Sequence, residues 1–139
     1  MEKSVKPPTF IMLIDDTPED LFISNRILEK YAVNKRIMTF NSGLPAIEYL
    51  QMYQNEMEKI PDIIFCDLHM PVMDGYQFLA AYDKLPAAVK GKCKVFILSS
   101  SSVMDDRMKL DSNRNVVRFY EKDLTKEVVE EIINKAATD

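Results

Sequence analysis

The hydrophobic residues of the chain are concentrated in five short runs, separated by longer stretches with helical periodicity. The runs are of strand length and are rich in β-branched and aromatic side chains; they cover residues 9–14, 35–40, 63–66, 94–98 and 116–120. Short apolar runs of this kind are typical of strands that are buried on both faces, as in parallel sheets. Strands that alternate with helices predict an α/β domain built from βα units.

Amphipathic stretches follow these runs, and five of them predict helices. Thr17 and Pro18 are suited to cap and begin the first helix. Apolar residues at i, i+4, i+7 and i+11 extend the second helix from Ala46 as far as Met57. The predicted helices cover residues 17–31, 46–57, 78–85, 105–111 and 125–136, and residues 87–92 are expected to form a loop.

Right-handed crossover connections place helices on both faces of such a sheet. The predicted fold class is therefore a doubly wound α/β domain, and we expect its five parallel strands to have the flavodoxin-like order 2-1-3-4-5. In this order the chain changes direction across the sheet between strands 1 and 3. Ligands of open α/β sheets bind at this switch point, outside the carboxyl ends of the strands.

Length and composition fit one globular domain. The 139 residues are 47% hydrophobic and carry a net charge of −4, and a chain of this length can bury a full core. We expect residues 1–8, which are polar and contain proline, to form a mobile arm. Residues 9–139 are expected to form a single domain with no output domain. The acidic balance argues against nucleic acid or an anionic membrane as a partner.

The sequence also argues against a membrane or secreted protein. It contains neither an apolar stretch of membrane-helix length nor the apolar centre of a signal peptide. The two cysteines and the single histidine do not have metal-ligand spacing. Reduced structural thiols are typical of cytosolic proteins, so we expect a cytoplasmic location.

Polar side chains with distinct chemistry follow the ends of four predicted strands. Asp15 and Asp16 follow the first strand, Asp67 the third, Ser99 the fourth and Lys122 the fifth. The three carboxylates should converge at the switch point, where they would repel one another. Mg²⁺, a hard cation that prefers oxygen ligands, would relieve this repulsion. Acids, a hydroxyl and an ammonium together suit the acceptance of a phosphoryl group on a carboxylate.

These motifs resemble the receiver domain of two-component response regulators, and in particular its stand-alone, chemotaxis-regulator-like members. The resemblance covers about residues 10–136, and its aspartate-to-glycine stretch over residues 67–75 is highly specific. The matching segments are Ile14-Asp15-Asp16, Asp67-Leu68-His69-Met70-Pro71-Val72-Met73-Asp74-Gly75, Ile97-Leu98-Ser99-Ser100 and Lys122.

The resemblance implies a metal-assisted phosphoacceptor site. Asp67 would be the phosphoacceptor. Asp16, with help from Asp15, would hold Mg²⁺ together with Asp67 and the main-chain carbonyl of His69. The implied chemistry is limited to Mg²⁺-dependent phosphorylation from a donor and slow self-dephosphorylation, so the protein would not be an enzyme in the ordinary sense.

The resemblance also implies a switch and two kinds of partner. Ser99 would donate its hydroxyl to a phosphoryl oxygen, Lys122 would pair with the phosphate, and Phe119 matches the family's aromatic switch position. The phosphate would come from a sensor histidine kinase or a phosphotransfer protein. A downstream protein would bind the face formed by the predicted helix at 105–111, the strand at 116–120 and the last helix.

Asp123 is a clear departure from the family pattern, because the family usually has proline after the lysine, on a cis bond. A cis bond without proline costs about 2.5–4 kcal/mol. The sequence therefore leaves open whether the Lys122–Asp123 bond is cis or trans. Asp123 also adds a negative charge near Lys122.

Three alternative functions remain to be compared. A degenerate, unphosphorylated receiver that serves as an interaction module is weakly favoured by Asp123 and opposed by the full set of acids. A phosphatase of the haloacid dehalogenase type needs a DxDx[TV] strand end, which neither Asp15 nor Asp67 begins. A flavodoxin-like electron carrier needs a phosphate-binding loop after the first strand, where Asp15 and Asp16 would repel the flavin phosphate.

Overall fold

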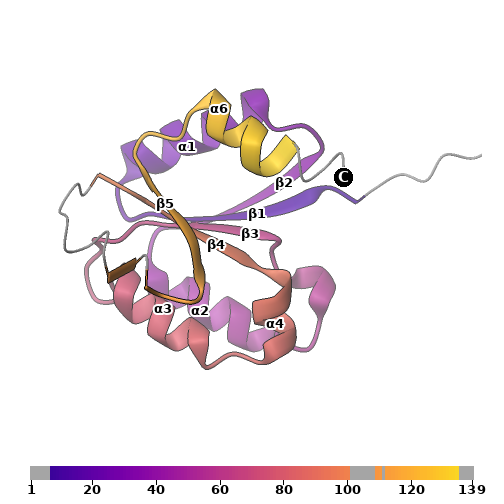
Figure 1. Cartoon of the computed structure of the whole chain (residues 1–139), viewed down its shortest axis with the longest axis vertical. Coiled ribbons are helices and arrows are strands. Elements are labelled where there is room, and N and C mark those ends of the chain that lie inside the picture. The colour runs from indigo at the N-terminus through magenta and orange to yellow at the C-terminus, as the bar shows by residue number, and fades with distance from the viewer. Residues whose placement is uncertain (1–6, 101–108, 111, 135–139) are drawn as a thin grey trace, which may run out of the picture.

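A five-stranded parallel sheet forms the centre of the molecule in the computed structural model, which describes residues 7–100, 109, 110 and 112–134. Its strands lie in the order β2-β1-β3-β4-β5 (Figure 1). Each neighbouring pair is parallel, so the predicted fold class and strand order are confirmed. The strands are β1 (Thr9–Ile14), β2 (Lys35–Phe40), β3 (Ile63–Cys66), β4 (Lys94–Ser99) and β5 (Val116–Glu121).

Helices cover both faces of this sheet, as Figure 1 shows. One face is covered by α1 (Pro18–Tyr31) and by α6 (Lys126–Val129), which continues into the π-helical turn η2 (Glu130–Asn134). The opposite face is covered by α2 (Gly43–Met52), α3 (Gly75–Asp83) and α4 (Ala87–Lys92). Among the described residues, no helix has both the length and the apolar character that a membrane span requires.

The sheet separates two hydrophobic cores, because successive strand residues point to opposite faces. Ile64 of β3 packs in the core beneath α2 and α3, whereas its neighbour Phe65 packs in the core beneath α1 and α6. Every residue of β3 is buried, which explains why this strand is an unbroken apolar run in the sequence.

Two details of the predicted helices are wrong, namely the end of the second helix and the loop predicted at residues 87–92. The second helix ends at Met52, and Met57 lies in a separate 3₁₀ turn, η1 (Met57–Lys59). The Tyr49 hydroxyl donates to the Lys59 carbonyl at 2.6 Å and holds this turn against α2. Met57 still packs on the core. Its place in the apolar pattern therefore indicated that its side chain is partly buried, and not that the helix continues to this residue.

The predicted loop at residues 87–92 is instead the short helix α4. Pro86 precedes it, its first two residues are alanines, and Val89 is buried against the core. Alanine is the best helix former, and the buried side chain of Val89 anchors the helix to the core. The arm predicted at residues 1–8 and the helix predicted at 105–111 lie largely outside the described residues. Within 105–111 the structure describes residues 109 and 110, and both are helical.

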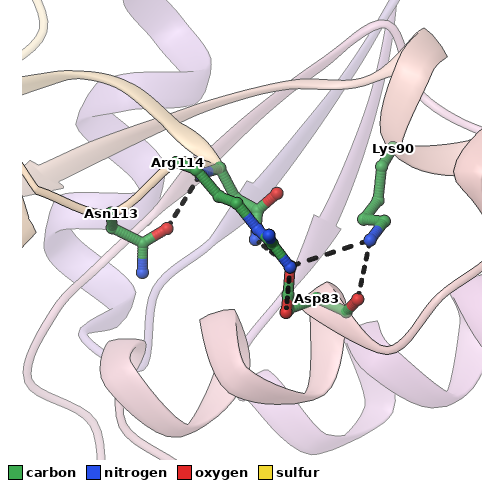
Figure 2. A network of polar contacts seen from close by, with 5 residues as sticks. Asp83, Lys90, Asn113 and Arg114 are labelled. Carbon is green, nitrogen blue, oxygen red and sulfur yellow. Dashed lines mark hydrogen bonds and ion pairs between the residues drawn. The ribbon is translucent and has the colours of Figure 1, made fainter.

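A polar network ties α3 and α4 to the segment that precedes β5 (Figure 2). Arg114 donates to both carboxylate oxygens of Asp83, at 2.9–3.1 Å, and Asn115 donates to the same carboxylate at 2.9 Å. Lys90 donates to the main-chain carbonyl of Asp83 at 2.8 Å. A bidentate Arg–carboxylate pair has a defined geometry, so the network positions the start of β5 against α3.

Candidate functional site

Three aspartates meet at the carboxyl ends of β1 and β3. Asp15 and Asp16 directly follow β1, and Asp67 directly follows β3. The amide of Asp67 donates to the Ile14 carbonyl at 2.9 Å, which holds Asp67 beside the end of β1. Each of the three aspartates offers an oxygen, and these oxygens lie within 4.8 Å of one another. The structure therefore brings together the three carboxylates that the sequence predicted would converge.

Asp15 is oriented by the start of α1. One of its carboxylate oxygens accepts a hydrogen bond from the amide of Thr17 at 2.9 Å. Thr17 is the N-cap residue of α1, but its side chain makes no capping hydrogen bond with any described residue, so the predicted capping role of this side chain is wrong. The short aspartate side chain organises the turn instead, as Asx turns do.

The loop after Asp67 makes a close turn back over the end of β3. The amide of Gly75 donates to the Leu68 carbonyl at 2.7 Å, and a Cβ on Gly75 would lie 2.8 Å from the Leu68 Cα. Asp74 and Gln77 form a reciprocal capping box at the start of α3, with two hydrogen bonds of 2.9 Å. Glycine is needed here because the two backbones approach so closely.

Lys122 brings a cation into this group of acids. Its ammonium nitrogen lies 2.7 Å from Asp15 Oδ2, 2.9 Å from Asp20 Oδ2 and 3.4 Å from Asp67 Oδ2. Its main-chain amide donates to the Ser99 carbonyl at 3.0 Å, which extends the β4–β5 pairing by one step. The bond from Lys122 to the next residue is cis, which answers the question that the sequence left open.

Asp20 is the site residue that sequence reasoning missed. It lies in the first turn of α1, where an acid is already explained by the positive end of the helix dipole. Its contact with Lys122 joins residues that are 102 positions apart in the chain. Local spacing carries no signal for such a pair.

Burial and charge act in opposite directions on the two central groups. Burial raises the pKa of the Asp67 carboxyl, with a further contribution from Asp15, while Lys122 opposes the shift. Burial alone would lower the pKa of Lys122, but its hydrogen bonds to Asp15 and Asp20 and the negative charges of Asp67 and Asp15 together outweigh burial and raise the pKa. Lys122 therefore remains an ammonium at neutral pH and supplies the positive charge among the acids.

The other predicted residues lie around this centre. Ser99 is completely buried at the end of β4, and His69 is exposed in the loop after Asp67. Phe119 is 5% exposed and belongs to the core on the α2 and α3 side, whereas Tyr120 packs against the opposite core. Phe119 and Tyr120 thus point to opposite faces of the sheet, as successive residues of a strand do.

Comparison with known proteins identifies the family. The model of the response regulator receiver domain matches residues 11–134. The chain belongs to the response regulator receiver domain family. Response regulator Rcp1 of a Synechocystis species is 29% identical over 108 residues, which are 76% of this chain and 71% of Rcp1. The resemblance predicted from the strand-end motifs is thus confirmed.

Solved receiver structures share the architecture of this receiver domain. A two-component response regulator from Cytophaga hutchinsonii aligns with a TM-score of 0.85 and 25% identity, covering 96% of this chain and 100% of the other. The Mn²⁺-bound form of Rcp1 aligns with a TM-score of 0.71 and 23% identity, covering 94% and 93%. Domains of this family are signalling domains whose general role is in phosphorelays from histidine kinases.

Proposed function

We propose that this receiver domain accepts a phosphoryl group on Asp67 from a sensor histidine kinase or a phosphotransfer protein, and then signals by binding a partner. The observation that carries the proposal is the buried carboxylate of Asp67, 3.4 Å from the Lys122 ammonium and beside two further aspartates. A nucleophilic carboxylate next to a fixed cation suits the charge that develops on a transferred phosphoryl group.

The proposed transfer requires one bond to form and one to break. An oxygen of the Asp67 carboxylate bonds to phosphorus while the donor's bond to that phosphorus breaks, and the electron pair leaves with the donor group. Lys122 balances negative charge on the phosphoryl oxygens. Loss of the group follows when a water oxygen bonds to phosphorus, the aspartyl oxygen leaves as carboxylate, and a proton passes to solvent. Asp67 is only 6% exposed. Its burial limits the access of water to the phosphoryl group and supports slow self-dephosphorylation.

Asp15, Asp16 and Asp67 offer the hard oxygen donors that Mg²⁺ prefers, and their spacing within 4.8 Å fits a single ion. We infer that these residues hold Mg²⁺, with the main-chain carbonyl of His69 as a further ligand. The bound ion would neutralise part of the charge of the acids and of the phosphoryl group.

Signalling is proposed to pass through Ser99 and Phe119. Ser99 would donate to a phosphoryl oxygen, and the movement of its strand end would change the space available to the Phe119 ring. The partner would bind the face that includes β5, α6 and the helix predicted at residues 105–111. The free thiols of Cys66 and Cys93 support a cytoplasmic location, where such thiols stay reduced.

The test is incubation with acetyl phosphate and Mg²⁺, followed by intact-mass measurement. The parent protein should gain one phosphoryl group, and Asp67→Asn should gain none, because an amide is a poor nucleophile. Asp62→Asn is the matched control, since Asp62 accepts a hydrogen bond from the Phe10 amide at the amino edge of the sheet. Equal modification of Asp67→Asn would overturn the assignment of the acceptor.

Two further results would favour the alternatives. A parent protein that gains no mass would support an unphosphorylated interaction module. Sustained turnover of a chromogenic phosphate ester would support a phosphatase.

A further inference from the structure

Lys122 has a carboxylate partner that does not come from a strand end. Asp20 lies in the first turn of α1, and its Oδ2 accepts a hydrogen bond from the Lys122 ammonium at 2.9 Å. This distance is shorter than the 3.4 Å between the same ammonium and Asp67. The ammonium therefore contacts Asp67 but is held closer to Asp15 and to Asp20 of α1.

We propose that Asp20 is a positioning residue for Lys122, which holds the ammonium beside α1 and competes with the phosphoryl group for it. The inference rests on the proposed phosphorylation of Asp67. It predicts that Asp20 slows phosphorylation by keeping the cation partly engaged elsewhere.

The Lys122 ammonium has a limited number of hydrogen-bond donors. The group carries three N–H donors, and three carboxylates surround it, those of Asp15, Asp20 and Asp67. A phosphoryl group on Asp67 replaces the charge of that carboxylate with new acceptor oxygens, so the ammonium can turn fully towards them only by releasing Asp15 or Asp20.

Of Asp15 and Asp20, Asp20 is the partner that can be released with the smaller loss. The Asp15 side chain is 8% exposed, whereas the Asp20 side chain is 31% exposed. A buried carboxylate that loses its cation is left with neither a cation nor water beside it. At a partly exposed carboxylate, water can replace the lost cation. Exchange of Asp20 for a phosphoryl oxygen is thus the favoured exchange.

Glu19 provides a matched control for the charge and helix position of Asp20. Both acids lie in the first turn of α1, so both complement the helix dipole and contribute a negative charge near the site. Among the described residues, the carboxylates that pair with Lys122 are those of Asp15, Asp20 and Asp67, and Glu19 is exposed. Glu19→Gln removes one negative charge from the first turn of α1 and leaves the contact between Asp20 and Lys122 intact.

The experiment measures the rate of phosphoryl gain by intact mass, with acetyl phosphate and Mg²⁺, in the full chain. Asp20→Asn should raise the rate at least about fivefold, the lower end of ordinary coupling between two sites. Glu19→Gln should stay close to the parent rate. In a Lys122→Met background Asp20→Asn should give no acceleration, because the effect acts through the lysine. If Asp20→Asn does not fold, Asp20→Ser carries the same comparison.

The outcomes separate this inference from the function on which it rests. A parent protein that is not modified on Asp67 overturns both. A modified parent in which Asp20→Asn and Glu19→Gln behave alike overturns the role of Asp20 alone. Acceleration that persists in the Lys122→Met background would mean that Asp20 acts by repelling the donor, and it would also overturn the positioning role.

Discussion

The ammonium nitrogen of Lys122 lies 2.7 Å from Oδ2 of Asp15, and both side chains are only 8% exposed. This ion pair connects the residue after β5 with the residue after β1, across the two intervening strands of the sheet. Charges that are taken out of water in this way depend on their partner, because loss of one partner leaves the other charge buried and unpaired.

Lys122→Met should lower the free energy of unfolding by about 3–5 kcal/mol, the usual effect of breaking a buried ion pair. Methionine is unbranched and only one heavy atom shorter than lysine, but it leaves Asp15 and Asp67 facing each other without the cation. Urea denaturation with a chelator present would measure the loss. Lys94→Met, at an exposed lysine of β4, is the control, and an equal small effect of the two substitutions would contradict the prediction.

Mg²⁺ should stabilise the folded protein, because an ion that binds only the folded state shifts unfolding by mass action. The gain should be about 1.4 kcal/mol at ten times the dissociation constant. The measurement is the melting temperature across a millimolar titration of Mg²⁺. Asp16→Asn should remove most of the gain, since Asp16 belongs to the carboxylate group. A melting temperature that is insensitive to Mg²⁺ in the parent protein would count against the metal site.

Gly75→Ala should destabilise the protein by about 1–3 kcal/mol, as overpacking of a tight contact does. The new methyl group would lie 2.8 Å from the Leu68 Cα and 2.9 Å from the Asp67 carbonyl oxygen, and neither backbone atom can move away cheaply. Gly91→Ala is the opposite case, because no described atom lies within 4 Å of its Cβ position in α4.

Gly91→Ala should therefore stabilise the protein, by about 0.5–1 kcal/mol, since alanine is the better helix former. Chemical denaturation of both variants beside the parent tests the pair. A Gly75→Ala variant as stable as the parent would show that the loop after Asp67 is not held as closely as the structure has it.

The Asp83 network should make stability depend on acid pH. Hydrogen bonds from Arg114 and Asn115 lower the pKa of the Asp83 carboxyl from 3.8 to about 2. Because the folded-state pKa is depressed, the stabilisation is complete above the unfolded value of 3.8 and is lost as the pH falls through about 2.

Asp83→Asn should thus be less stable than the parent at pH 7, and the difference should shrink between about pH 4 and pH 2. Melting temperatures of both proteins over this range test the prediction, together with an NMR titration of the Asp83 carboxyl. A midpoint near 3.8, the ordinary value, would show that the network in Figure 2 does not persist in solution.

Phosphorylation should change amide hydrogen exchange between about residues 99 and 120 and have little effect on α1 away from the metal site. Ser99 is buried at the end of β4, and its carbonyl is bonded to the Lys122 amide, so a shift of Ser99 is transmitted to the end of β5. Ser99→Ala should remain phosphorylated and show a smaller change in exchange. Exchange that changes only around Asp67 would contradict the proposed switch.

Much of the architecture could be predicted because it depends on neighbours in the chain. The predicted strands agree with the observed ones to within one residue. The three central strands β1, β3 and β4 are almost wholly buried and therefore appear as apolar runs, whereas the edge strands β2 and β5 are only partly buried. The second helix was predicted too long because Met57 contributes to the core from a 3₁₀ turn. The helix at residues 87–92 was missed because it buries only Val89 and therefore leaves no periodic pattern.

The sequence by itself determined the order of the elements and the residues at the strand ends, including Asp67 and Lys122. These features depend on spacing along the chain, which hydrophobic burial and turn chemistry impose locally. Only the tertiary structure decided which carboxylates hold the lysine, with Asp15 and Asp20 nearer than Asp67. Electrostatic energy depends on distance through space, and Asp20 and Lys122 are 102 residues apart, so their pairing exists only once the sheet and α1 have packed together.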